Sequence, residues 1–345
     1  MLTTLIGIIS ALLAGILNGS FAAPMKRMLN WKWENIWLMW AFWALFIIPW
    51  LVTFFAVSEL TNIYYEVPTN VLLKTFLFGA GWGIGAITFG IGMYMVGLSL
   101  GFSIIIGVTA VTGSLIPMLI FSRETVFTIG GMIIILGLLF VIIGVGLCGL
   151  AGTIREKNLQ VKQNKSTGNY NFKYGFFICI VSGIFSAMLN LAFVFGKPIA
   201  DIAKNYIGNL ESTFSANSPI WSLALTGAFI TNLLYCGILL LGKKTWRKYV
   251  EQGTRTYWFW TMLMGILWFS GVTLYGAGAS SLGEIGVTVA WIILMAVTVL
   301  VGNIWGILSG EWKDIPKSAH QYMIKGLSFL IVSIFLVSLG QYLSP

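Results

Sequence analysis

Charge is what this sequence has least of. Only 9% of its 345 residues are charged and 58% are hydrophobic, whereas about a quarter of a soluble domain is charged. Lipid is therefore the expected solvent for most of the chain. A helix needs roughly 20 apolar residues to cross about 30 Å of hydrocarbon. Ten segments meet this need: residues 2–23, 36–57, 75–96, 100–121, 128–150, 174–196, 219–241, 257–279, 285–309 and 325–343.

Catalytic and metal-binding groups are also few. The single histidine, His320, stands among charged residues in a short connection, without partners at the spacing of a triad or a zinc site. Cys148, Cys179 and Cys236 lie singly in expected spans and form no C-x-x-C pair. No Walker A loop is present. The sequence therefore predicts no enzyme, no catalytic residue, no metal and no cofactor.

The few charges that remain are unevenly placed. The chain has 20 lysines and arginines against 11 acids, for a net charge of +9. Sixteen of the basic residues fall in the connections that follow odd-numbered spans, and four fall on the opposite side. Loops rich in lysine and arginine stay in the cytoplasm. Both termini are then expected outside it, and the basic balance needs no nucleic acid to explain it.

An internal repeat is the strongest pattern in the chain. The segment from Gly79 to Gly97 recurs 186 positions later as Gly265 to Gly283. Matched pairs are Gly79 with Gly265, Trp82 with Trp268, Gly85 with Gly271, Phe89 with Tyr275, Gly90 with Gly276, and Gly92 with Gly278. A second correspondence, at an offset of 168, joins Gly7 and Gly15 to Gly175 and Gly183. Repeats of this kind are typical of transporters built from two related halves.

The repeat predicts the domain organisation. Residues 1–154 form a first five-helix repeat, 155–173 a basic cytoplasmic linker, and 174–345 a second repeat. Because five is an odd number, the second repeat enters the membrane upside down. The expected fold is therefore an all-α integral membrane protein of ten transmembrane helices in two inverted repeats. Such repeats place the substrate at their interface near the midplane, and rocking of the halves gives alternating access.

Smaller signals refine the element boundaries. A tight turn is expected near Gly97, because residues 75–122 are long enough for two spans. Lys197 is expected to end the sixth span, because Pro198 follows it and proline disfavours a continuing helix.

Aromatic and uncharged polar residues inside the spans are the candidate substrate ligands. Trp82, Trp268 and Tyr275 share helix faces with the matched glycines and are expected to stack on a ring-shaped substrate. Asn18, Thr88, Asn190 and Thr273 bond hydroxyls in this interpretation without the cost of a buried charge. The alternative is that these side chains only pack or bond between helices. As a set around two tryptophans, they favour a sugar over a hydrophobic drug.

Two charged residues near the span ends are candidates for proton coupling. Glu284 follows Gly283 at the turn between the eighth and ninth spans, and Lys197 lies on the same membrane side. If Glu284 points inward, it is a carboxylate able to carry a proton with the substrate. If it points outward, it is a loop acid. Lys197 is either a partner at the mouth of the site or an ammonium group reaching the interface.

Several short runs resemble one family, the L-rhamnose–proton symporters of bacterial inner membranes. They are Asn18 to Lys26, Trp31 to Glu34, Phe78 to Gly85 with Phe89 and Gly90, Gly97 to Gly101, Ser182 to Ser186 with Lys197 and Pro198, and Glu311 to Lys313. The similarity extends over the whole chain in length and span count. That family is similar in turn to the wider drug/metabolite transporters, which have a five-plus-five architecture.

The resemblance implies import of a deoxyhexose driven by a proton gradient. We therefore expect a secondary transporter for a small neutral sugar, L-rhamnose above all, in the bacterial inner membrane. Its partners would be the sugar, protons and the lipid bilayer, and it would be a monomer or a homodimer. Three alternatives remain: sodium-coupled sugar uptake, a drug/metabolite exporter or exchanger on the same scaffold, and a noncatalytic subunit of a membrane assembly.

Overall fold

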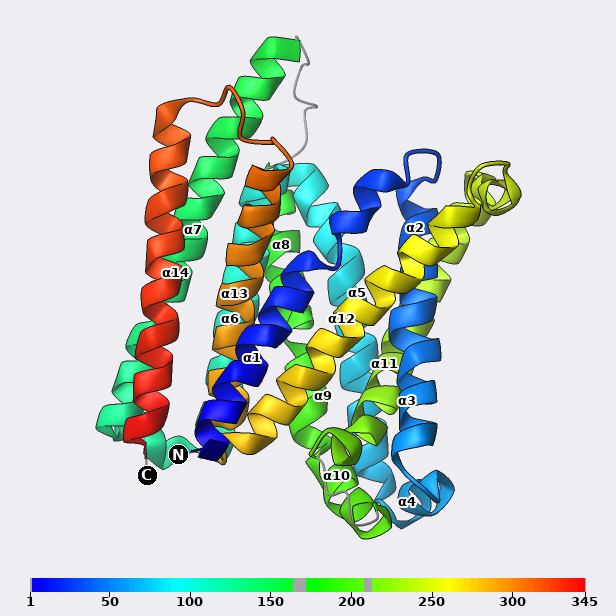
Figure 1. Ribbon diagram of the computed structural model, residues 1–345, viewed down its shortest axis with the longest axis vertical. Coiled ribbons are helices and arrows are strands. Elements are labelled where there is room, and N and C mark those ends of the chain that lie inside the picture. Colours follow the sequence, from blue (N-terminus) through cyan, green and yellow to red (C-terminus); the bar gives the residue numbers. More distant parts are fainter. Residues whose placement is uncertain (1, 164–171, 208–212, 345) are drawn as a thin grey trace.

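The fold was analysed in a computed structural model that describes residues 2–163, 172–207 and 213–344. Every regular element in these ranges is helical (Figure 1). The α-helices are α1 (Leu2–Ser20), α2 (Trp33–Ala41), α3 (Ile48–Ala56), α4 (Leu60–Glu66), α5 (Thr69–Val96), α6 (Leu98–Phe121), α7 (Ile129–Gln163), α8 (Phe172–Ser186), α9 (Met188–Phe195), α10 (Lys197–Ala203), α11 (Thr213–Gly242), α12 (Arg255–Ser281), α13 (Gly286–Leu308) and α14 (Lys317–Leu343). A π-helical turn, η2 (Phe42–Ile47), joins α2 to α3, and short 3-10 turns are η1 (Ala23–Arg27), η3 (Arg123–Phe127), η4 (Lys204–Tyr206) and η5 (Thr245–Val250).

The predicted number of spans is confirmed. Among the described residues, ten helical segments are long and apolar enough to cross a membrane. The second of them runs through α2, η2 and α3, and the sixth runs from α8 through α10. The expected turn between the third and fourth spans is also present, since Gly97 joins α5 to α6 with a φ of 99°. Only glycine adopts this backbone conformation without a steric penalty.

Two boundaries differ from the sequence expectation. The sixth span does not stop at Pro198, because this proline stands in the first turn of α10 and the chain stays helical to Ala203. Proline is tolerated there since its missing N–H would have no partner within the helix. Helix α7 continues through the first part of the predicted linker, from Arg155 to Gln163. Its charged residues are good helix formers, so the helix persists past the apolar segment.

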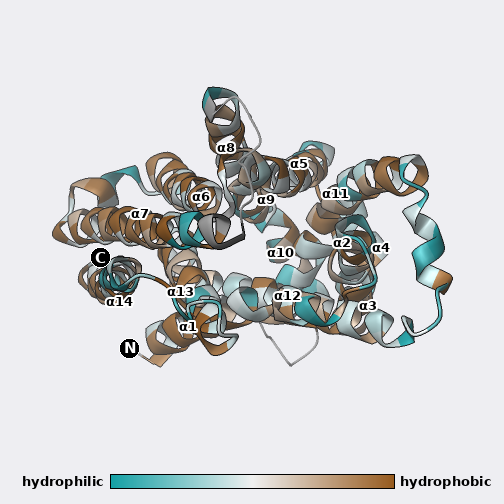
Figure 2. Ribbon diagram, turned by 90° about the horizontal axis from the view of Figure 1, so that it is seen from above, coloured by the Kyte–Doolittle hydropathy of each residue, from teal (hydrophilic) through white to brown (hydrophobic). Residues whose placement is uncertain are grey.

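Helices α7 and α14 lie together at one edge and α2, α3 and α11 at the other, while α1 and α12 cross the bundle obliquely (Figures 1 and 2). The first and last described residues lie at the same end of the bundle (Figure 1). The basic connections after α1, α11 and α13 and the charged last turns of α7 lie at the opposite end. This separation agrees with the uneven distribution of charge along the sequence.

Helix α5 carries glycines where other helices cross it closely. A side chain at Gly79 would overlap the carbonyl oxygen of Ala224 on α11. A Cβ at Gly85 would lie 2.6 Å from the backbone nitrogen of Ser186, at the end of α8. Both contacts are backbone to backbone, so only glycine allows the helices to approach this far.

Helix α12 repeats this arrangement with partners from the other half. A Cβ at Gly265 would lie 2.7 Å from the Cβ of Trp43 on η2, and one at Gly271 would lie 3.0 Å from the carbonyl oxygen of Ala14 on α1. The third span therefore crosses the seventh and sixth, and the eighth crosses the second and first. Each glycine of the first repeat therefore contacts a helix of the second, and its counterpart contacts the corresponding helix of the first.

The shorter correspondence shows the same exchange. Gly7 and Gly15 of α1 pack on α12 and α13, whereas Gly175 and Gly183 of α8 pack on α5 and α6. These paired contacts are those expected of two repeats related by a pseudo-two-fold axis, and they are consistent with the inverted repeat. The division at residues 154 and 174 stays a prediction.

The glycine crossings lead to a first prediction. Gly79→Ala should lower the melting temperature, because overpacking of a tight contact costs about 1–3 kcal/mol and the added methyl group meets backbone. Gly107→Ala on α6 is the matched control, since a Cβ at that position would have open space around it out to 4 Å. There the better helix propensity of alanine should leave stability equal or higher. The measurement is thermal unfolding in detergent. A melting temperature of Gly79→Ala equal to or above that of Gly107→Ala would contradict the close crossing.

Candidate functional site

A cavity of about 390 Å³ lies where the two halves meet. Its walls come from α1, α2, α5, α6, α12 and α13, with contributions from η1 and the ends of α8 and α9. Ten aromatic side chains line it: Phe21, Trp33, Trp37, Trp40, Trp82, Phe89, Phe102, Trp268, Tyr275 and Trp291. Few polar side chains reach it, among them Asn18, Thr109, Ser186 and Thr298. A mostly apolar wall with a small number of polar groups is typical of a pocket for a small molecule.

Trp82 and Trp268 contact each other inside this cavity. Their ring centroids are 5.1 Å apart and the planes are inclined by 34°. These two residues are also equivalent in the internal repeat. Equivalent residues of two inverted repeats touch only near the axis that relates them, so this contact is consistent with a cavity on a pseudo-two-fold axis. The two tryptophans are placed as an aromatic surface against which a sugar ring can pack.

The structure places the other predicted ligands in two groups. Asn18 lines the cavity, and no hydrogen bond of its side chain occurs within the described residues. Thr88 and Thr273 do not line it. The Thr88 hydroxyl bonds the carbonyls of Ile84 and Gly85, and Thr273 bonds those of its own helix in the same way. Their role as sugar ligands stays a prediction, and in this conformation they act within their helices.

Tyr275 lines the cavity and is held from behind by Asn190. The Tyr275 hydroxyl donates to the side-chain oxygen of Asn190, and the Asn190 amide donates to the carbonyl of Gly113 at 2.6 Å. Tyr275 and Asn190 are both almost completely buried. Because a buried polar group without a partner is costly, this chain of bonds holds α12, α9 and α6 in register. Asn190 is therefore a supporting residue behind the wall.

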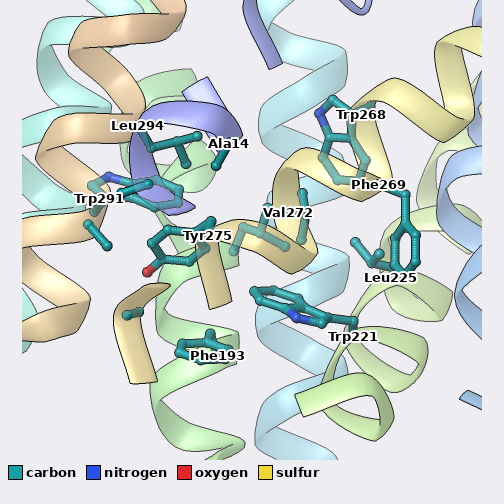
Figure 3. Close-up of a cluster of buried hydrophobic side chains, with 14 of the residues drawn as sticks. Ala14, Phe193, Trp221, Leu225, Trp268, Phe269, Val272, Tyr275, Trp291 and Leu294 are labelled. Atoms are coloured by element: carbon teal, nitrogen blue, oxygen red, sulfur yellow. The ribbon is translucent and has the colours of Figure 1, made fainter. Parts of the chain in front are cut away.

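An aromatic layer continues below Tyr275 (Figure 3). Phe193 stacks on Trp221 with centroids 4.9 Å apart and planes inclined by 9°, and it lies 5.8 Å from Tyr275. Trp291 closes the other flank of Tyr275 at 5.4 Å. We name Phe193, Trp221, Tyr275 and Trp291 the aromatic plug. The plug separates the central cavity from a second pocket, which Phe193 also lines.

The second pocket contains both predicted coupling residues. It measures about 420 Å³, and Lys197 and Glu284 line it together with Asp201 and Lys204. Both Lys197 and Glu284 are exposed. They therefore stand on the same side of the membrane and face one vestibule, separated from the central cavity by the plug. Their role in proton coupling stays a prediction.

A third pocket adjoins the cavity at the basic end of the bundle. It measures about 720 Å³ and shares Met93 and Phe102 with the cavity. Glu311, in the connection from α13 to α14, accepts a hydrogen bond from Lys26 and lies 2.8 Å from the guanidinium of Arg155. Glu311 thus ties η1 and α7 of the first half to the second half. The cavity therefore adjoins this pocket toward the basic end, and the plug lies toward the other end.

Three tryptophans of the cavity wall were not among the substrate ligands predicted from the sequence. Trp33, Trp37 and Trp40 come from α2 and line the cavity. Their spacing of four and then three residues puts them on one helix face. The signal was therefore present, but these residues have no aromatic counterparts in the repeat that pointed to Trp82 and Trp268.

Comparison with known proteins agrees with this site. A model of the L-rhamnose-proton symport protein family matches residues 2–342. The chain belongs to this family. The L-rhamnose-proton symporter of Mannheimia succiniciproducens is 29% identical over 328 residues, which are 93% of each chain. Those of Pectobacterium atrosepticum and Yersinia pestis are 28% and 29% identical over 344 residues, or 98% of each chain.

Membership of the L-rhamnose-proton symport protein family makes the chain a membrane transporter and not an enzyme. It confirms the resemblance found in the sequence, which was carried by short runs around Pro24, Trp82 and Ser182. The residues that line the aromatic cavity include parts of each of these runs, among them Asn18, Trp82 and Ser186.

The ion pairs of Glu311 give a pH-dependent prediction. Partial burial favours the neutral carboxyl group, but the hydrogen bond from Lys26 and the charges of Arg155 and Lys26 outweigh it. The pKa of Glu311 therefore lies below its ordinary value of 4.5. The stabilisation is full above about pH 4.5 and is lost as the pH falls through the lowered value. Because the pairs are partly exposed, the effect should be small.

The measurement is thermal unfolding as a function of pH. Glu311→Gln should be less stable than the wild type by a few degrees near neutral pH, and the gap should narrow as the pH falls below 4.5. Glu251→Gln, which breaks the exposed pair with Lys248, is the control and should show no such change. Equal pH profiles for Glu311→Gln and the wild type would rule out the stabilising pair.

Proposed function

We propose that this protein imports L-rhamnose, or a closely related small neutral sugar, together with protons. The observation that carries the proposal is the aromatic cavity in which Trp82 and Trp268, equivalent in the internal repeat, contact each other. Family membership supports the substrate, because the curated relatives are L-rhamnose-proton symporters.

The chemistry of the wall fits a neutral sugar. The C–H faces of a sugar ring are apolar and pack on aromatic rings, whereas its hydroxyls need a few hydrogen-bond partners. Asn18 and Ser186 offer such partners at the wall. No lysine, arginine, aspartate or glutamate among the described residues lines this cavity. A charged substrate would therefore be desolvated here without compensation.

The proposed transport cycle is alternating access between two states. In the present conformation the aromatic plug lies at one end of the cavity, and the pocket at the basic end adjoins the other. The excess of lysine and arginine assigns that end to the cytoplasm. We therefore interpret the conformation as inward-facing, in a bacterial inner membrane, with both termini periplasmic or extracellular. Opening of the plug and closure around Glu311 would give the outward-facing state.

Coupling to protons needs a group that gains and loses a proton during the cycle. Glu284 is our candidate, because it lines the outer vestibule beside Lys197 and follows directly on α12, which also carries Tyr275. Protonation there would change the charge of the vestibule next to the plug. Glu284→Gln should abolish sugar accumulation driven by a pH gradient and leave sugar exchange between the two sides intact. Undiminished accumulation would remove Glu284 from the mechanism.

Uptake into proteoliposomes tests the function directly. Radiolabelled L-rhamnose should accumulate under an inward proton gradient, and a protonophore that collapses the gradient should abolish accumulation. Accumulation that follows a sodium gradient instead would indicate sodium coupling. Absence of uptake, with outward flux of other metabolites, would favour the exporter. A protein that carries no flux alone but copurifies with a partner would be an assembly subunit.

The aromatic surface leads to a prediction for binding. The double variant Trp82→Ala, Trp268→Ala should bind L-rhamnose about tenfold more weakly, because aromatic contacts contribute about 0.5–1.5 kcal/mol each beyond burial. Trp246→Ala, at an exposed position on η5, is the control and should bind normally. Equilibrium binding of labelled sugar to purified, monodisperse protein measures both. Unchanged affinity in a folded double variant would remove the stacking role.

A further inference from the structure

The outer vestibule, which is the second pocket described above, has the dimensions of a ligand site. Its volume is about 420 Å³, against about 390 Å³ for the central cavity. Among the described residues, the two pockets have no lining residue in common. The aromatic plug lies between them, since Phe193 lines the vestibule whereas Tyr275 and Trp291 line the cavity. A molecule in the vestibule would therefore occupy a separate site.

The wall of the vestibule is polar and its charges balance. Two lysines and two acids line it, and Lys204 pairs with Asp201 at 2.8 Å. Lys197 and Glu284 are exposed and make no ion pair within the part of the chain that the structure describes. Because positive and negative groups are equal in number, the vestibule has no excess charge to attract an ion. The wall is therefore suited to a neutral, polar ligand.

Asn217 on α11 presents an unused hydrogen-bonding group to this pocket. Its side chain lines the vestibule although the residue is only 5% exposed. The amide nitrogen donates to the hydroxyl oxygen of Ser280 at 3.0 Å, and the carbonyl oxygen has no hydrogen bond within the described residues. The indole nitrogen of Trp221, one turn further along α11, is closed to solvent, whereas the Asn217 oxygen keeps accessible surface. It is therefore free to accept a bond from a ligand.

Aromatic side chains complete the wall. Phe121 at the end of α6 and Phe193 on α9 both line the vestibule. Aromatic rings together with a few hydrogen-bonding groups suit a sugar, whose C–H faces are apolar and whose hydroxyls need partners. Building on the proposed function, we propose that the outer vestibule is a second sugar-binding site, which the sugar occupies before it reaches the central cavity.

The groups at the wall match the two properties of a sugar hydroxyl, which both donates and accepts. The Asn217 carbonyl and the Glu284 carboxylate accept from hydroxyls, whereas the Ser280 hydroxyl and the Lys197 ammonium group donate to them. Phe193 stacks on Trp221 in the plug, with centroids 4.9 Å apart. A sugar held in the vestibule would therefore lie against the outer side of the plug.

The test is protection of a cysteine placed in the vestibule. Val287 lines the pocket and is half-buried, and the three native cysteines are buried, so Val287→Cys adds the reactive thiol. L-Rhamnose should slow alkylation of this thiol by a hydrophilic reagent in the purified protein. Asn217→Leu and Ser280→Ala should each raise the sugar concentration for half-maximal protection about two- to tenfold, the usual effect of one hydrogen bond.

Three controls separate the vestibule from other effects. Ser218→Ala removes a buried hydroxyl that bonds the carbonyl of Ser215 and does not line the vestibule, so protection should be unchanged. Thr61→Cys is exposed on α4 at the same end of the bundle, outside the pocket, and its alkylation should not respond to sugar (Figure 1). The double variant Trp82→Ala, Trp268→Ala alters only the central cavity, so vestibule protection should persist in it.

The outcomes that contradict the vestibule site differ from failure of the proposed function. Protection that is lost in the Trp82→Ala, Trp268→Ala variant but kept in Asn217→Leu and Ser280→Ala would come from the central cavity. Absence of protection in a Val287→Cys protein that still takes up L-rhamnose would contradict the vestibule site and leave the proposed function intact. Absence of both protection and uptake in otherwise wild-type protein would contradict both.

Discussion

Close approach of helix backbones is the constraint on which this structure depends. Helices α5 and α12 carry glycines where they cross the helices of the opposite half, and at Gly79 and Gly85 the neighbouring atoms are backbone. Lipid provides no hydrophobic drive between helices, so association depends on such contacts. The same crossings bring Trp82 and Trp268 together. The glycines therefore fix the dimensions of the cavity as well as the packing of the two halves.

The aromatic plug and the ion pairs of Glu311 lie at different ends of the central cavity. The plug holds its position through Tyr275 and Asn190, a buried bond that joins α12 to α9. Glu311 is partly exposed and holds η1 and α7 through charge. A buried neutral bond resists salt and pH, whereas a partly exposed ion pair responds to both. The interactions at the two ends therefore differ in their sensitivity to salt and pH.

The sequence predicted the ten spans, the turn at Gly97 and the two tryptophans at the centre, because long apolar runs and a repeat are global signals. It did not predict the continuation past Pro198, since a proline in a first turn looks like one that ends a helix. It also missed Trp40 in the cavity wall. It gave no sign that Asn18 lines the cavity whereas Thr88 bonds its own helix. Which polar side chain is satisfied by its own helix depends on rotamer and packing, and spacing alone does not contain that information.

A cavity on a two-fold axis presents the same surface to a ligand in two orientations. A sugar has no such symmetry, so a perfectly symmetric wall would bind it in two poses of equal energy, and only one of them would be productive. The halves differ where this matters, since Tyr275 carries a hydroxyl at the position that Phe89 occupies in the other repeat. Differences between the two repeats at single positions thus favour one orientation of the bound sugar over the other.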